Sequence, residues 1–135
     1  MLNIYVLEDH FIQQNRIEEV IHTILKKNNI KVGDFEVFDK PNQLLDFITE
    51  RGSHQLFFLD IQIKDDTKKG LEVAKQIRKS DPYANIVFFT THSEYLPLTF
   101  QYQLAALDFI DKSLEGEDFQ KRLESIILLT CKKIQ

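Results

Sequence analysis

The sequence predicts an α/β fold, a (βα)5 doubly wound sandwich built on a parallel five-stranded sheet. Five short apolar runs alternate along the chain with amphipathic stretches of helical periodicity. The runs lack the alternation of half-exposed strands, as expected when helices cover both faces of a parallel sheet. No repeat or low-complexity linker interrupts the 135 residues, which favours one domain over residues 1–135.

The expected strands and helices alternate in chain order. The expected strands are residues 2–7, 35–38, 55–59, 86–89 and 107–110. Apolar positions at helical spacing mark four helices between and after them: Ile12, Ile17, Val20, Ile21, Ile24 and Leu25; Leu44, Leu45, Phe47 and Ile48; Leu71, Val73, Ala74 and Ile77; Phe119, Leu123, Ile126, Ile127 and Leu129. A further helix over residues 95–103 requires Pro97 to lie in its first turn.

Composition excludes several classes of protein. The single cysteine, Cys131, rules out a disulfide scaffold, and the scattered histidines lack the spacing of a structural zinc site. A formal charge of −4 argues against nucleic-acid binding by this chain alone. No apolar run approaches the roughly 20 residues that span a bilayer. Met1 leads into a charged segment at residues 8–10 rather than a signal peptide, so we expect a cytoplasmic protein with no membrane partner.

Polar residues follow four of the expected strands. They are Glu8 and Asp9 after the first, Asp60 after the third, Thr90 at the end of the fourth and Lys112 after the fifth. Ligands of open parallel sheets bind beyond the carboxyl ends of the strands. We therefore expect three acids, a hydroxyl and an ammonium to meet at one edge of the sheet.

This combination of groups suits phosphoryl chemistry. Carboxylates about 4 Å apart repel each other by roughly 4 kcal/mol per pair at an effective dielectric near 20, so a cation is expected among them. Mg²⁺ prefers such oxygen ligands, and Lys112 adds a second positive charge. Asp60 could then attack a phosphoryl donor to form an aspartyl phosphate, with the Thr90 hydroxyl bonded to a phosphoryl oxygen.

Each residue also has an ordinary structural interpretation. Glu8 and Asp9 could cap the first helix, Asp60 could begin a loop, and Lys112 could simply pair with an acid. We interpret His10 and His92 as solvated loop histidines, because no ligand partners accompany them in the sequence. The placement of the other residues at successive strand ends favours the functional interpretation.

Taken together, these residues resemble the receiver domain of bacterial two-component response regulators, over essentially the whole chain. The resemblance implies the flavodoxin- or CheY-like receiver fold and a phosphoacceptor at Asp60. It also implies Mg²⁺ bound by Glu8, Asp9, Asp60 and the backbone carbonyl of Gln62, with Thr90, Lys112 and the aromatic Phe109 as switch residues. Ser113 follows Lys112 where many receivers carry a cis-proline, so this loop is expected to be set differently.

Three strings resemble one subfamily more narrowly. FLDIQ around Asp60, TTHSE from Thr90 and GLEVAKQIR from Gly70 are similar to regulators of the AgrA/ComE type, found in peptide quorum sensing of Gram-positive bacteria. Such regulators carry a LytTR-type DNA-binding domain after the receiver. The resemblance therefore implies that this chain is one part of a longer regulator and that its C-terminal DNA-binding domain is absent here.

The resemblance implies a signalling role rather than an enzyme. A sensor histidine kinase would phosphorylate Asp60, the receiver would form a homodimer, and an attached domain would contact DNA and control transcription. An alternative is a pseudo-receiver that dimerises without phosphate. A phosphatase of the haloacid dehalogenase type would need a second Asp where Gln62 stands, and the sequence has no nucleotide-binding glycine loop, so neither that enzyme nor a flavodoxin is favoured.

Overall fold

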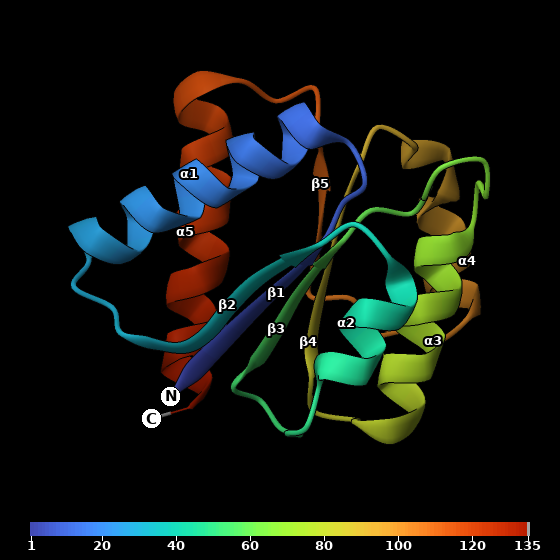
Figure 1. The fold of residues 1–135 in the computed structure, drawn as a ribbon, viewed down its shortest axis with the longest axis horizontal. Helices are drawn as coiled ribbons and strands as arrows, with labels where there is room; N and C mark the ends of the chain where they lie inside the picture. The colour runs from blue at the N-terminus through green and yellow to red at the C-terminus, as the bar shows by residue number, and fades with distance from the viewer. Residues whose placement is uncertain (135) are drawn as a thin grey trace.

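The computed structural model describes residues 1–134 and has the predicted (βα)5 architecture (Figure 1). In this part of the chain a parallel sheet of five strands has the order β2-β1-β3-β4-β5. The strands are β1 (Leu2–Leu7), β2 (Val32–Phe38), β3 (Gln55–Leu59), β4 (Asn85–Thr90) and β5 (Asp108–Asp111). The chain moves from β1 to one edge and returns to β3 on the other side of β1, so the topological switch point lies between β1 and β3.

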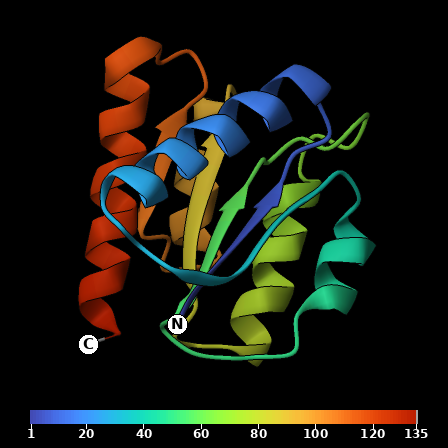
Figure 2. The same cartoon turned by 60° about the vertical axis from the view of Figure 1, so that its left-hand side comes forward.

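Helices cover both faces of the sheet, as Figure 2 shows from a second direction. On one face lie α1 (Phe11–Lys27) and α5 (Gly116–Lys133); on the other lie α2 (Pro41–Phe47), α3 (Lys69–Ser80) and α4 (Leu96–Gln101). A short 3-10 turn, η1 (Ser93–Tyr95), precedes α4. Among the described residues, no helix combines the length and apolarity that crossing a bilayer needs.

The continuous apolar runs are explained by two separate cores. In β3, Phe58 packs with the α1 and α5 side chains, whereas its neighbour Phe57 packs with those of α2 and α3. Both rings are fully buried, and burying such a side chain contributes roughly 1.5–3 kcal/mol to stability. Every residue of β1, β3 and β4 is buried, which confirms the prediction of strands covered on both faces.

Four elements differ from their predicted bounds. Strand β4, Asn85–Thr90, is one residue longer at each end than the predicted 86–89. The edge strand β2 begins at Val32 rather than residue 35, because the exposed Gly33 and the half-buried Asp34, which an edge strand tolerates, interrupt the apolar run. Strand β5 is shifted by one residue, to Asp108–Asp111. The predicted helix over residues 95–103 is divided into η1 and α4, with Pro97 in the first turn of α4 as required.

A polar network lies at the amino ends of the central strands. Asn3 of β1 donates to Gln55 Oε1 of β3 at 2.7 Å, and Asn85 of β4 donates to the carbonyl of Ser53 at 2.8 Å. Lys133, in the last turn of α5, donates to Asn85 Oδ1 at 2.8 Å. The end of α5 is thereby fixed to the edge of the sheet opposite its carboxyl ends.

Candidate functional site

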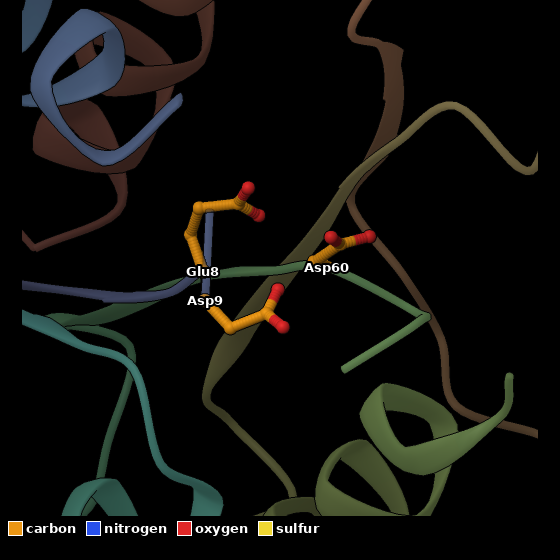
Figure 3. A group of neighbouring side chains, drawn as sticks. All are labelled: Glu8, Asp9 and Asp60. Carbon is orange, nitrogen blue, oxygen red and sulfur yellow. The ribbon is translucent and has the colours of Figure 1, made fainter. Parts of the chain in front are cut away.

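Three acidic residues meet at the topological switch point (Figure 3). Glu8 and Asp9 directly follow β1, and Asp60 directly follows β3. Pairing of Leu7 with Leu59 places these strand ends side by side, and the Asp60 N–H donates to the Leu7 carbonyl at 3.0 Å. Each acid offers an oxygen within 4.8 Å of the others. The predicted convergence of the three carboxylates is therefore present.

Lys112 brings a positive charge to these acids. Its backbone N–H donates to the Thr90 carbonyl at 3.0 Å, which extends the pairing of β5 with β4 by one residue. Its ammonium donates to Asp60 Oδ2 at 2.6 Å and to Glu8 Oε1 and Oε2 at 2.9 and 2.7 Å. Burial raises the pKa of Glu8, whereas the bonds from Lys112 oppose the rise. The Lys112 ammonium thus stabilises the negative charge of the buried carboxylates, which solvent does not reach.

Asp60 Oδ1 stands out among the buried polar atoms. Asp60 is only 5% exposed, and within residues 1–134 its Oδ1 is the one buried side-chain oxygen or nitrogen without a hydrogen-bond partner. An unsatisfied buried acceptor costs about 1–3 kcal/mol, and such exceptions mark places where a ligand supplies the missing partner. The orphaned oxygen points to a cation or phosphoryl group as that partner.

The loop after β3 holds Asp9. The Lys64 N–H donates to Asp9 Oδ2 at 2.7 Å, and Lys64 has a left-handed backbone with φ of 54°. Reciprocal backbone bonds of 3.0 Å between Ile63 and Asp66 close this turn. The Gln62 side chain donates to the Lys64 carbonyl at 3.1 Å. Sequence reasoning missed Lys64, since a backbone donor leaves no side-chain signal.

A hollow of about 340 Å³ opens above the acids. Its walls include the predicted Glu8, Asp9, Asp60, Gln62 and Lys112, together with His10, Gln13, Lys64, Thr91 and His92, which the prediction did not include. As predicted, both histidines lie in loops, where His10 is exposed and His92 is half-buried, and from there they border the hollow. His92 Nδ1 also lies 3.0 Å from Glu94 Oε1. In the sequence, only the positions of His10 directly after Asp9 and of His92 directly after Thr91 placed the two histidines near this edge of the sheet.

Two predicted switch residues lie outside this wall. The buried Thr90 hydroxyl accepts from the His92 N–H at 3.1 Å, and its neighbour Thr91 borders the hollow instead. Phe109 packs beside Phe88 with ring centres 6.1 Å apart, and it lines a second hollow, of about 410 Å³, between α4, β5 and α5. The structure thus brings together the acids and Lys112, whereas Thr90 is buried outside the wall of this hollow and Phe109 lines the other hollow.

The helix-capping interpretation of the acids is not what the structure shows. His10 is the N-cap of α1, and it makes no side-chain capping bond. Asp9 instead accepts from Lys64, and Glu8 accepts from Lys112. Both carboxylates are committed to the site rather than to the start of the helix.

Gly70 allows α3 to lie directly against the acceptor loop. Its N–H donates to the Ile61 carbonyl at 2.7 Å. A Cβ at this position would lie 1.8 Å from the Asp60 carbonyl oxygen, so any side chain would displace the backbone of Asp60. In the sequence, Gly70 was singled out only as the first residue of the string GLEVAKQIR. That string does not indicate the close approach of α3 to the Asp60 backbone.

The donor set fits a hard divalent cation. The ligand atoms on offer are the carboxylate oxygens of Glu8, Asp9 and Asp60, which suit Mg²⁺ better than softer metals. Three acids with one ammonium leave negative charge for a cation to neutralise, and Asp60 Oδ1 has no competing partner in the part of the chain described. The arrangement can therefore hold an oxygen-seeking metal beside a nucleophilic carboxylate.

Comparison with known proteins points in the same direction. The family described as the response regulator receiver domain matches residues 4–124. Accessory gene regulator protein A of Staphylococcus epidermidis is 35% identical over 116 residues, which cover 86% of this chain and 48% of that protein. The protein of the same name from Staphylococcus aureus is 33% identical with the same coverage. The chain thus spans about half the length of the curated relatives it matches.

Solved structures support the fold. The crystal structure of the response regulatory domain of protein mrkE from Klebsiella pneumoniae superposes with a TM-score of 0.68. The match covers 98% of this chain and 93% of that one at 24% identity. The predicted flavodoxin- or CheY-like receiver fold is confirmed, as is the similarity to quorum-sensing regulators of the AgrA type.

Proposed function

The chain belongs to the response regulator receiver domain family, and we propose that it accepts a phosphoryl group on Asp60 from a phosphohistidine of a sensor histidine kinase. The family is a signalling module rather than a class of catalytic enzymes. The observation that carries the proposal is the state of the Asp60 carboxylate. One oxygen is bound by the Lys112 ammonium at 2.6 Å, and the other is buried without a partner in residues 1–134.

In the proposed transfer, the Asp60 carboxylate replaces the donor imidazole on phosphorus. A bond forms between an Asp60 oxygen and phosphorus while the bond between phosphorus and the donor nitrogen breaks. The leaving imidazole keeps the electron pair and takes up a proton. Lys112 lies beside the same carboxylate, so its ammonium can offset the negative charge that the phosphoryl oxygens bring.

Mg²⁺ fits the remaining donors. Glu8, Asp9, Asp60 and the Gln62 backbone carbonyl would hold it, and the bound ion would neutralise charge on the phosphoryl oxygens. The turn at Lys64 keeps Asp9 in place for this role through its 2.7 Å bond. Because Lys112 contacts both Glu8 oxygens, Glu8 would contribute mainly through its charge or through water.

The readout that we propose runs from the site to the face formed by α4, β5 and α5. Phosphorylation adds about −1.5 to −2 charges and new acceptor oxygens, which can draw in the Thr90 hydroxyl and Lys112. Phe109, on the neighbouring strand, would then change its packing and favour a homodimer. In a longer regulator, an attached DNA-binding domain would convert the dimer into control of transcription, as the name of the half-matched relatives suggests.

Phosphorylation by acetyl phosphate tests this function directly. The purified chain is incubated with acetyl phosphate, with and without Mg²⁺, and its intact mass is measured. We expect one added phosphoryl group that requires Mg²⁺ and is lost in Asp60→Ala and in the isosteric Asp60→Asn. Asp65→Asn is the matched control, because Asp65 is an exposed acid in the same loop.

The opposite outcome identifies the alternative. A folded chain that gains no phosphoryl group, yet dimerises at low micromolar concentration, would be a pseudo-receiver that acts by association alone. Labelling that persists in Asp60→Asn would assign the acceptor to another residue and refute the proposal for Asp60.

A further inference from the structure

Arg16 ties α1 to the loop that carries Lys112. Its Nη1 donates to the Lys112 carbonyl at 2.8 Å, and its Nη2 donates to the Leu114 carbonyl. These two carbonyls flank Ser113, so the guanidinium bridges both sides of the turn after β5. A planar guanidinium offers parallel donors at a fixed spacing, which a lysine cannot do.

The guanidinium is itself held in place. It lies over the Phe119 ring, 3.8 Å from the ring centre, and Phe119 is 1% exposed in the core between α5 and the sheet. A cation over an aromatic face gains about 0.5–2 kcal/mol, more as water is excluded. Arg16 therefore has one face on a rigid ring and one edge on the loop.

The same turn of α1 also holds the other side of the site. Gln14, two positions before Arg16, donates from Nε2 to the Glu8 carbonyl at 2.5 Å. Glu8 and Lys112 come from opposite ends of the chain, and their side chains meet in the site. Gln14 and Arg16, in one turn of α1, thus hold the backbone of the acid and the backbone of its ammonium partner.

We propose that Arg16 is a positioning residue that holds Lys112 against Asp60 for phosphoryl transfer, an inference that rests on the function proposed above. The Lys112 side chain must place its ammonium 2.6 Å from Asp60 Oδ2, and Arg16 holds the loop that carries it through the Lys112 and Leu114 carbonyls. The hydrogen bond from Arg16 to the Lys112 carbonyl restrains the backbone of the residue whose ammonium contacts the Asp60 carboxylate. Small misplacements of such groups can cost up to about 100-fold in rate.

The test compares phosphorylation rates of matched variants. Wild type, Arg16→Met, Arg16→Lys and the control Arg51→Met are labelled with acetyl phosphate at saturating Mg²⁺, and intact mass is followed with time. We expect about a 10-fold lower maximal rate for Arg16→Met, partial recovery for Arg16→Lys and no change for Arg51→Met, which removes an exposed arginine outside the site.

A second readout separates positioning from general damage to the site. Mg²⁺ affinity, measured by calorimetry, should stay within about two-fold of wild type in Arg16→Met, because Gln14 still holds the Glu8 backbone. A parallel loss of Mg²⁺ affinity and rate would mean that Arg16 only supports the fold, and it would overturn the proposal.

A double-mutant cycle shows whether Arg16 acts through Lys112. In a Lys112→Met background, adding Arg16→Met should slow labelling no further; losses that multiply would refute the coupling. Where Lys112→Met does not fold, Lys112→Arg serves as the second background. If the wild type is not labelled, the proposed function and the inference are refuted together. If the wild type is labelled and Arg16→Met is labelled at the same rate, only the inference is refuted.

Discussion

Lys112 donates hydrogen bonds to both carboxylate oxygens of Glu8, at 2.9 and 2.7 Å, although the two residues are 104 positions apart in the chain. Glu8 is fully buried and Lys112 is 9% exposed. In such surroundings a charge without a partner is far more costly than the pair. The ammonium is therefore a structural counter-ion for Glu8 as well as the proposed partner of the phosphoryl group.

Removal of this counter-ion should destabilise the fold. Lys112→Met leaves two buried carboxylates without their ammonium, and we expect a loss of about 3–5 kcal/mol in the free energy of unfolding, measured with urea. Adding Glu8→Gln to the same chain should recover part of the loss, because the buried charge is removed. Mg²⁺ should also recover part of it by supplying positive charge. A loss below about 1 kcal/mol would show that the pair is solvated in solution.

The close approach of α3 to the acceptor loop predicts a strong effect at Gly70. In Gly70→Ala the new Cβ would lie 1.8 Å from the Asp60 carbonyl oxygen, so the loop or α3 must move. We expect a loss of about 2–4 kcal/mol in stability and a large decrease in Asp60 labelling.

Gly116→Ala is the matched control for Gly70→Ala. Its Cβ would meet nothing within 4 Å, although its φ of +55° gives a strain cost of about 1–2 kcal/mol. Labelling of Asp60 should be kept in this control. Equal effects of the two substitutions on labelling would contradict the role assigned to the close approach.

The raised pKa of Tyr5 predicts that the stability of the fold decreases at alkaline pH. Burial raises its pKa to about 12 from 10.0, with a further contribution from its hydrogen bond to Asp34. Between these values the folded chain keeps a proton that the unfolded chain has lost, so this contribution to stability is complete below pH 10 and decreases as pH rises through 12. Tyrosinate absorbance should show a late-titrating group that is missing in Tyr5→Phe and retained in the exposed control Tyr83→Phe.

Phe100 predicts the location of the proposed dimer contact. It is 76% exposed and borders the hollow between α4, β5 and α5 together with Leu96 and Phe109. Large aromatic side chains at the centre of an interface typically contribute about 2 kcal/mol or more. Phe100→Ser should therefore weaken dimers of the phosphorylated chain by about 30-fold in sedimentation, without loss of labelling. The exposed Tyr83→Ser is the control, and undiminished dimers in Phe100→Ser would place the interface elsewhere.

The predictable part of the fold is the part encoded by buried runs. Strands β1 and β3 have the predicted bounds, since residues covered on both faces leave an uninterrupted apolar signal. The start of β2 and the division of residues 93–101 into η1 and α4 were missed. Half-exposed edges and short helical turns depend on tertiary contacts rather than on periodicity.

The site was predictable where function sits on side chains at strand ends. Glu8, Asp9, Asp60 and Lys112 meet as expected, because a parallel sheet brings the ends of its strands to one edge. Arg16 and Lys64 were not predictable. Arg16 acts across 96 positions on a backbone carbonyl, and Lys64 acts through its N–H, and neither contact has a local pattern.

The fixed ends of α5 give the helix a mechanical role. Near its start Phe119 supports the Arg16 guanidinium, and in its last turn Lys133 is bonded to Asn85. A helix of 18 residues is roughly 27 Å long at 1.5 Å per residue. Because such a helix is held near both ends, we expect it to move as one rigid unit. A shift of the Lys112 loop would therefore tilt α5, and the tilt would stretch the Lys133–Asn85 hydrogen bond at the amino ends of the strands.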